Sequence, residues 1–363
     1  MRFYNNQLSY CTNIHPYTNL QELIETIKTH VKTVAGNFSQ PSAAGLHLNH
    51  RLVEELTGSP TNLTLLKQTL EQNQLYVCSL NCFPYGEFHN QPVKEKVYYP
   101  DWGSQARVAY TIKAAEILQN LLPENLEGSI STVPITYGKA IPEHTFTNLK
   151  KVTRYLHSLP SKITLALEPE PDCYLDTTAD TIAFFTELKT ILSPEEFKHV
   201  GLCFDTCHFA VGFEDVSQAF RQIQNADIPI PKVQISAALK TFNPQALQQF
   251  VEPVYLHQTA IRDANGRIKC YKDLTADLLR QSSQNRELEW RVHFHVPIHQ
   301  HDLGDGLAST ADCLPDFLRL LKKMSNIHVE LETYSFSVIK EVKESVTDSI
   351  INELNYILEV SND

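Results

Sequence analysis

Four apolar segments in the C-terminal two thirds of the chain end in residues that can bind a metal ion or move a proton. The segments are TLALEPEP with Glu168, GLCFDTCH with Asp205 and His208, KVQIS with Gln234, and HVELETY with Glu332. Short apolar runs of this kind predict buried parallel strands, and barrels of such strands carry their active sites at the carboxyl ends of the strands. We therefore expect these side chains at one rim of a barrel.

The carboxylates in this set predict a metal site. Unpaired carboxylates are costly to bury, and a divalent cation supplies the compensating charge. We expect one divalent cation (Mn, Mg, Co or Zn), and the expected ligands are Glu168, Asp205, Gln234, Glu332 and His295. The expected catalytic groups for proton transfer are Glu168, Glu332 and His208. For any single glutamate, an ion pair with a nearby Lys or Arg is the competing interpretation.

A histidine-rich segment, RVHFHVPIHQH, precedes the last of the four apolar runs. His293 and His295 would share one face of an extended segment, as metal sites often require, although surface histidines are also common. The Asp-Thr-Cys-His sequence places His208 three residues after Asp205, where a strand would leave the barrel. We interpret Cys207 as a small loop residue rather than a ligand or nucleophile, because the sequence shows no basic partner for its thiol.

Strands and helices alternate along the chain and would position these residues. Strands are expected at 8–13, 44–49, 75–81, 128–135, 164–170, 200–206, 232–236 and 327–333. Amphipathic helices are expected near 20–34, 62–73, 103–121, 147–158, 178–192, 215–224 and 347–358. This rhythm predicts a single α/β domain over residues 1–363, a (β/α)8 TIM barrel. A doubly wound open sheet is the alternative, but no Gly-rich fingerprint follows the first strand, and the chain has only 12 Gly.

The stretch between Gln234 and Glu332 exceeds one strand–helix repeat by about one further repeat, which predicts an insertion after strand seven at residues 237–290. Within it, Asn265-Gly266 lies between two short alternating runs and predicts a β-hairpin, because both turn residues tolerate positive φ. The hairpin is either a lid over the carboxyl-terminal face, which would bring His257 to the site, or a solvated surface element. The aromatic loop at 83–101 is likewise either a pocket wall or simple packing over the barrel mouth.

Composition excludes some classes of partner. The net charge of −11 at pH 7 disfavours long contact with nucleic acid or an anionic membrane surface. A signal-peptide pattern is absent from the N-terminal sequence, and the chain contains no uninterrupted apolar run long enough to span a bilayer, so no membrane insertion is expected. Eight cysteines, several inside apolar runs, fit a reducing compartment, and we predict a cytoplasmic protein. The sequence is compatible with a homo-oligomer.

The residues at the strand ends resemble the xylose isomerase-like barrel superfamily, which includes sugar isomerases, sugar epimerases and the endonuclease IV group. The family pattern falls on Glu168 for strand five, Asp205 with Thr-Cys-His for strand six, Gln234 for strand seven and Glu332 for strand eight. An Asp-x-His and a Gly-x-Gly follow strand seven in endonuclease-type members, and residues 293–295 and 304–306 are similar. Two departures stand out: Gln234 replaces the usual His, and the first His of the loop pair replaces an Asp.

A narrower resemblance links the chain to the EboE-type metabolite traffic proteins. The segments LSYCTNIHP, YYPDWGSQARVAYT and YLHQTAIRDANGR carry it, and it implies a role for Asn13 and His15 in the site. Residue 17 is Tyr, where that family is expected to have Gly. The residues that we expect to contact substrate are Asn13, His15, His47, Asn81, His257 and His293.

These expectations together predict a metal-dependent isomerase or epimerase. The enzyme would act on a small polyol or sugar-like metabolite by proton transfer next to a carbonyl, with one cation bound. Two alternatives stay open at this point. The additional histidines could bind a second or third ion for a hydrolase or phosphodiesterase, or the barrel could bind a metabolite in a traffic pathway without turning it over.

Overall fold

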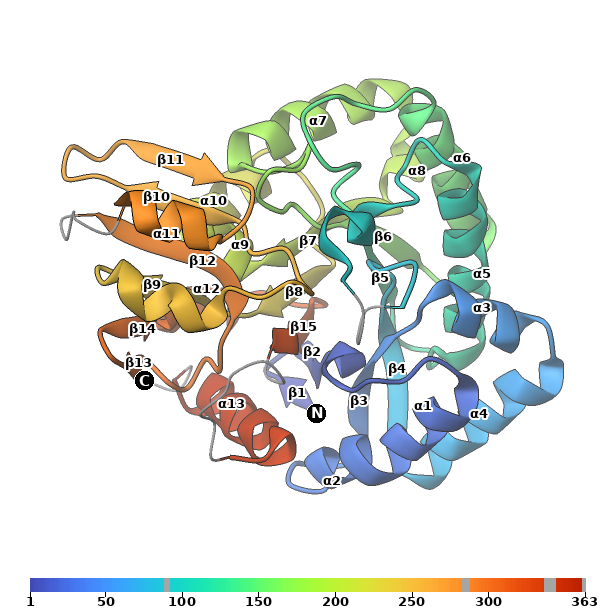
Figure 1. Cartoon of the computed structure of the whole chain (residues 1–363). Coiled ribbons are helices and arrows are strands. Elements are labelled where there is room, and N and C mark those ends of the chain that lie inside the picture. Colours follow the sequence, from blue (N-terminus) through green and yellow to red (C-terminus); the bar gives the residue numbers. More distant parts are fainter. Residues whose placement is uncertain (88–91, 283–287, 336–343, 361–363) are drawn as a thin grey trace.

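The computed structural model describes residues 1–87, 92–282, 288–335 and 344–360, and its centre is a barrel of eight parallel strands (Figure 1). The strands are β2 (Asn6–Tyr10), β3 (Ser42–His47), β4 (Leu75–Asn81), β5 (Gly128–Thr132), β6 (Ile163–Leu167), β7 (Val200–Asp205), β8 (Lys232–Ile235) and β15 (His328–Leu331). Each pairs in parallel with the next, and β15 pairs with β2. A parallel bridge between Cys11 and Gly45 joins β2 to β3 and closes the ring. The TIM barrel predicted from the sequence is confirmed.

The closing bridge depends on a close approach between β2 and β3. A Cβ atom on Gly45 would lie 2.6 Å from the carbonyl oxygen of Tyr10 and would collide with the carboxylate of Glu330. Only glycine fits there, because any side chain would push the two strands apart.

Helices surround the barrel because they bury their apolar faces against the strands. Their bounds are α1 (Leu20–Thr26), a π-helical turn (Ile27–Val31), α2 (Lys32–Ala35), α3 (His50–Thr57), α4 (Pro60–Gln72), α5 (Gln105–Leu121), α6 (Thr145–Ser158), α7 (Thr178–Ile191), α8 (Pro194–Phe197), α9 (Thr206–Val211), α10 (Val216–Asn225), α11 (Ala276–Ser282), α12 (Leu314–Leu321) and α13 (Val346–Val360). Short 3₁₀ helices span Thr12–Ile14, Lys94–Tyr98, Pro244–Phe250 and Thr310–Cys313. Among the described residues, no helix is both long and apolar enough to cross a membrane.

A buried ion pair lies inside the barrel below the strand ends. The ammonium group of Lys232 on β8 lies 2.6 Å from the carboxylate of Glu330 on β15, and neither side chain has any exposed surface. Lys232 also donates to Ser131 at 3.1 Å. Burial and the charge of Lys232 together lower the pKa of His328, on the strand of Glu330, to about 4. Part of the barrel core is therefore polar, and the opposite charges of Lys232 and Glu330 compensate each other there.

A second, antiparallel sheet lies beside the barrel, in the orange and yellow part of Figure 1. Its strand order is β11-β10-β12-β9-β14-β13. The bounds are β9 (Ala238–Thr241), β10 (Thr259–Arg262), β11 (Ile268–Tyr271), β12 (Glu289–His295), β13 (Asp302–Gly304) and β14 (Leu307–Ser309). The structure places a hairpin at β10 and β11, with Gly266 at φ +78° in its turn. The insertion was predicted to end at residue 290, but the antiparallel sheet continues beyond it, because β12 pairs with both β9 and β10.

Candidate functional site

Three carboxylates meet at the carboxyl ends of the barrel strands. Glu168 follows β6, Asp205 ends β7 and Glu332 follows β15, and one oxygen from each lies within 4.8 Å of the other two. All three side chains are buried. Burial first, and then the neighbouring carboxylates, raise the pKa of both Glu168 and Glu332 well above the usual range. The cluster therefore demands a cation or bound protons.

Hydrogen bonds hold one oxygen of the Asp205 carboxylate, and other buried oxygens of the cluster have no partner among the described residues. Asp205 caps α9, so its Oδ1 atom accepts from the backbone N–H groups of Cys207 (2.7 Å) and His208 (3.1 Å). The same oxygen accepts from the Ser236 hydroxyl at 2.6 Å. Among the described residues, Oδ2 of Asp205 and Oε2 of Glu168 have no hydrogen-bond partner although both are buried. Unpartnered anionic oxygens of this kind fit a cation as their ligand.

Two amides orient Glu332. The side-chain amides of Asn13 and Asn81 donate to its Oε1 atom at 2.7 Å and 3.2 Å. Asn13 follows the first barrel strand and Asn81 ends the third, so the barrel alone brings these residues to Glu332. Donors to a carboxylate stabilise its charged form, which is the form that binds a cation or accepts a proton.

Glu170 belongs to the site but was absent from the sequence-based set of site residues. Its Oε1 atom accepts from the Tyr98 hydroxyl at 2.7 Å and from the Gln258 amide at 3.2 Å, and it lies 3.4 Å from Nδ1 of His293. The Glu-Pro-Glu spacing was a signal for Glu170, because the two glutamates are two residues apart. Tyr98 lies in the 83–101 loop and Gln258 in the insertion, so the sequence indicated both segments as candidate parts of the site but not their contacts with Glu170.

Three imidazole rings lie next to the carboxylates, and a carbonyl acceptor fixes each ring. Nδ1 of His208 donates to the carbonyl oxygen of Pro169 at 2.7 Å, and Nδ1 of His295 donates to the carbonyl oxygen of Glu332 at 3.0 Å. Nδ1 of His293 donates to the side-chain oxygen of Gln258 at 2.8 Å. Burial lowers the pKa of His295 to about 4 and the pKa of His293 well below its usual range. Neutral rings with a protonated Nδ1 present a bare Nε2, which is the arrangement of metal-binding histidines.

A pocket opens above these groups. Its polar floor includes Glu168, Glu170, His208, His293 and Glu332. Asn13, Asn81 and Lys94 add further polar groups, and the walls are formed by Phe83, Pro84, Val93, Val97, Tyr98, Tyr255, Leu256 and Tyr334. Part of the 83–101 loop thus lines the pocket, while its residues 88–91 lie outside the described part of the chain. The pocket therefore combines carboxylate, imidazole and amide side chains with apolar walls.

The comparisons with known proteins agree with this architecture. The family described as the xylose isomerase-like TIM barrel matches residues 46–345 of the chain. The chain belongs to this family. No curated protein matches it in sequence.

Two solved structures resemble this xylose isomerase-like barrel over nearly its whole length. A xylose isomerase-like TIM barrel protein from Mycobacterium smegmatis, in complex with magnesium, has a TM-score of 0.55 and 11% identity, covering 99% of this chain and 96% of its own. The IolI protein with a bound zinc atom has a TM-score of 0.54 and 14% identity, covering 98% of each chain. At these identities the likeness concerns the fold alone.

The other predicted site residues of this xylose isomerase-like barrel lie in different surroundings. Gln234 is fully buried inside the barrel, where its side-chain oxygen accepts from the thiol of Cys203 at 3.0 Å. His257 contacts the carbonyl of His293 at 2.9 Å and the carboxylate of Glu252 at 2.8 Å, so both ring nitrogens are engaged. His15 contacts the Tyr10 hydroxyl at 3.0 Å, and His47 ends β3. None of these four is among the described residues that line the pocket.

A buried carboxyl group on α13 ties two site segments together and predicts a pH effect on stability. Glu353 accepts from the backbone N–H of Ile298 (3.0 Å) and the hydroxyl of Thr333 (2.9 Å), and burial raises its pKa to about 8. Its folded-state pKa exceeds the unfolded value, so the free energy of unfolding should fall as pH rises from about 5 to about 8, by at most about 5 kcal/mol. Chemical denaturation across this range should show a flatter profile for Glu353→Gln, whereas exposed Glu359→Gln should follow the wild type.

Proposed function

We propose that this protein is a metal-dependent isomerase or epimerase that acts on a small polyol or sugar-like metabolite. The observation that carries the proposal is the cluster of Glu168, Asp205 and Glu332 beneath a pocket that two of the three residues line. Two buried oxygens of this cluster have no hydrogen-bond partner in the described part of the chain. The magnesium and zinc in the two similar structures support a divalent cation in this family.

The three carboxylates would hold the cation. A bound divalent cation polarises a carbonyl and its neighbouring hydroxyl and acidifies the proton on the carbon next to the carbonyl. Gln234 pairs with Asp205 across β7 and β8 and stays a proposed ligand. His295 is a further proposed ligand, because it forms a second cluster with Asp205 and His208.

Proton transfer falls to the groups that line the pocket. We assign the base and acid roles to Glu168 and Glu332, which follow strands β6 and β15 and line the pocket. Asn13 and Asn81 hold Glu332 in one orientation. His208 lines the same pocket and stays a proposed proton-transfer group; its Nδ1 atom lies 4.0 Å from Oε1 of Glu168, beyond direct hydrogen-bond distance.

The pocket walls indicate the substrate class. Amides, carboxylates and imidazoles at the floor suit hydroxyl and carbonyl groups, whereas aromatic and aliphatic walls suit the C–H faces of a small polyol or sugar. Lys94 at the rim is already paired with Asp273 at 2.7 Å, so a charge on the substrate is not required to neutralise it.

A metal-dependent hydrolase is the second candidate function. The observation that favours it is the set of clusters that include His208, His293 or His295, because an additional ion would activate water. A metabolite-binding barrel of the EboE traffic type would use the same pocket without any proton transfer.

The test is proton exchange with solvent. The protein is stripped with a chelator, reloaded with Mn, Mg, Co or Zn, and incubated in D2O with a panel of ketoses, aldoses and their phosphates. We expect deuterium at the carbon next to the carbonyl, detected by NMR, only with the reloaded protein. Hydrolysis of phosphodiesters without exchange would replace the proposal by the second candidate. Ligand binding without exchange would favour a barrel that binds a metabolite without turning it over.

A further inference from the structure

Two segments that are far apart in the sequence meet at the wall of the pocket. Residues 93–98 belong to the loop after β4, and residues 252–257 belong to the insertion, before β10. The residues of these segments that line the pocket are Val93, Lys94, Val97, Tyr98, Tyr255 and Leu256. The backbone N–H groups of Val93 and Lys94 both donate to the carbonyl of Val254, at 2.9 Å and 3.2 Å. Separating the two segments would therefore open the wall of the pocket.

The side chain of Lys94 ties the loop to two parts of the insertion. Its ammonium group lies 2.7 Å from Oδ2 of Asp273, which follows β11, and donates at 3.1 Å to the carbonyl of Glu252, which precedes β10. The other carboxylate oxygen of Asp273 accepts from the backbone N–H of His257 at 2.9 Å. The neighbouring residues form a second ion pair, in which Lys272 contacts Glu95. Two adjacent ion pairs thus hold the insertion against the loop.

Both ion pairs are accessible to water. The side chains of Lys94 and Asp273 are 25% and 20% exposed, and those of Lys272 and Glu95 are 57% and 35% exposed. Ion pairs with this much access to water contribute little to stability, and dissolved salt weakens them further. Contacts of this kind can break locally while the barrel strands stay folded, because local opening costs less free energy than global unfolding.

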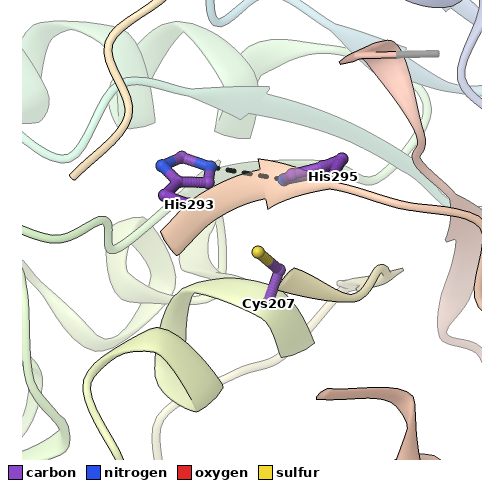
Figure 2. Close-up of side chains that lie close together, drawn as sticks. All are labelled: Cys207, His293 and His295. Carbon is purple, nitrogen blue, oxygen red and sulfur yellow. Dashed lines mark hydrogen bonds between the residues drawn. The ribbon is translucent and has the colours of Figure 1, made fainter. Parts of the chain in front are cut away.

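Gln258, the next residue along the insertion, is fixed to the pocket floor instead. Its side-chain amide donates to the carboxylate of Glu170 and to the carbonyl of Pro171, both at 3.2 Å. Its backbone carbonyl accepts from the N–H of His293 at 2.8 Å. His293 lines the pocket and lies beside His295 on β12 (Figure 2). An opening of residues 252–257 would therefore leave the floor in place.

We propose that the ion pairs Lys94–Asp273 and Lys272–Glu95 form a latch that holds the insertion closed over the pocket, and that opening of this latch admits and releases ligands. The base of the hairpin then acts as part of a lid, whereas its turn at Gly266 is exposed. Because opposite charges hold the latch, exchange of ligands should become faster as the ionic strength rises. The proposal concerns access to the pocket and holds whichever reaction takes place there.

Hydrogen exchange measured by mass spectrometry tests the latch without any ligand. In Lys94→Met, amide exchange should become about 10-fold faster in residues 93–95 and 252–257 together, because both segments lose the same ammonium group. Asp273→Asn should show a smaller increase, since it removes the charge but keeps an acceptor for the N–H of His257. Lys162→Met is the control, because its ion pair with Glu127 lies at the opposite end of the barrel. Wild-type exchange in both latch variants, or an increase in one segment alone, would overturn the proposal.

Release of Mn2+ into excess chelator, followed by electron paramagnetic resonance, tests access to the pocket. Release should be about 10-fold faster in Lys94→Met than in the wild type and in Lys162→Met. Raising NaCl from about 0.05 M to about 0.5 M should speed release from the wild type more than from Lys94→Met. Equal release rates despite faster amide exchange would overturn the gating role. A protein that binds no Mn2+ would refute the proposed cation site instead, and hydrogen exchange would still decide whether the latch exists.

Discussion

Lys232→Met is expected to lower the free energy of unfolding by about 3–5 kcal/mol, because it leaves a buried carboxylate without its partner. Lys232 and Glu330 are fully buried at 2.6 Å from each other inside the barrel. Burial would disfavour the charge of Lys232, yet the attraction of Glu330 raises its pKa above the usual value. Without the lysine, the charge of Glu330 would be unbalanced beside Glu332, whose pKa it already helps to raise. Urea denaturation would measure the loss.

The double variant Lys232→Met/Glu330→Leu should recover much of that loss, since buried ion pairs can often be replaced by apolar residues. Lys162→Met is the matched control, because its ion pair with Glu127 is about half exposed and should contribute less than about 1 kcal/mol. A Lys232→Met loss no larger than that of Lys162→Met would contradict the prediction.

Glu168→Gln is expected to lower kcat/KM by about 10³-fold on the substrate identified by proton exchange, the typical scale for losing a positioned acid or base. The amide cannot accept the proton, and it also weakens cation binding because it removes one negative charge from the cluster. Stopped assays under excess cation would separate the two effects, since excess cation restores binding but not the proton acceptor.

Glu127→Gln serves as the control, because Glu127 precedes β5 at the opposite end of the barrel and should leave kcat/KM unchanged. The pH dependence provides a second check. The pKa values of Glu168 and Glu332 are raised in the protein without a cation, so protons and the cation compete for these carboxylates. The affinity of the protein for the cation should therefore fall as the pH falls. Wild-type activity in Glu168→Gln at saturating cation would remove this residue from the chemistry.

The strand ends show how much of the site the sequence could predict. Each of the runs that carry Glu168, Asp205 and Glu332 is a short apolar segment, and short apolar runs form buried strands whichever helices cover them. Parallel strands that are joined by helices end on the same side, so the three carboxylates had to converge. The fold class and the carboxylate cluster therefore followed from local pattern and spacing.

Contacts between distant segments were not predictable in the same way. The antiparallel sheet brings His293 beside Gln258, and pairing between strands so far apart in the sequence leaves no local pattern. Glu330 illustrates the same limit, because its two-residue spacing from Glu332 predicts a shared face but not the ion pair with Lys232 below it.

Cys207 shows most clearly which features the sequence determined and which only the tertiary structure decided. The sequence alone determined the barrel, the rim and the carboxylates, since apolar runs and their spacing encode strands and strand ends directly. Only the tertiary structure decided that Cys207 lies next to two histidines from a strand more than 80 residues later, with both rings fixed through carbonyl acceptors. The physical reason is that the ligand properties of a side chain depend on the groups folded around it, and those groups come from segments whose pairing the local sequence does not encode.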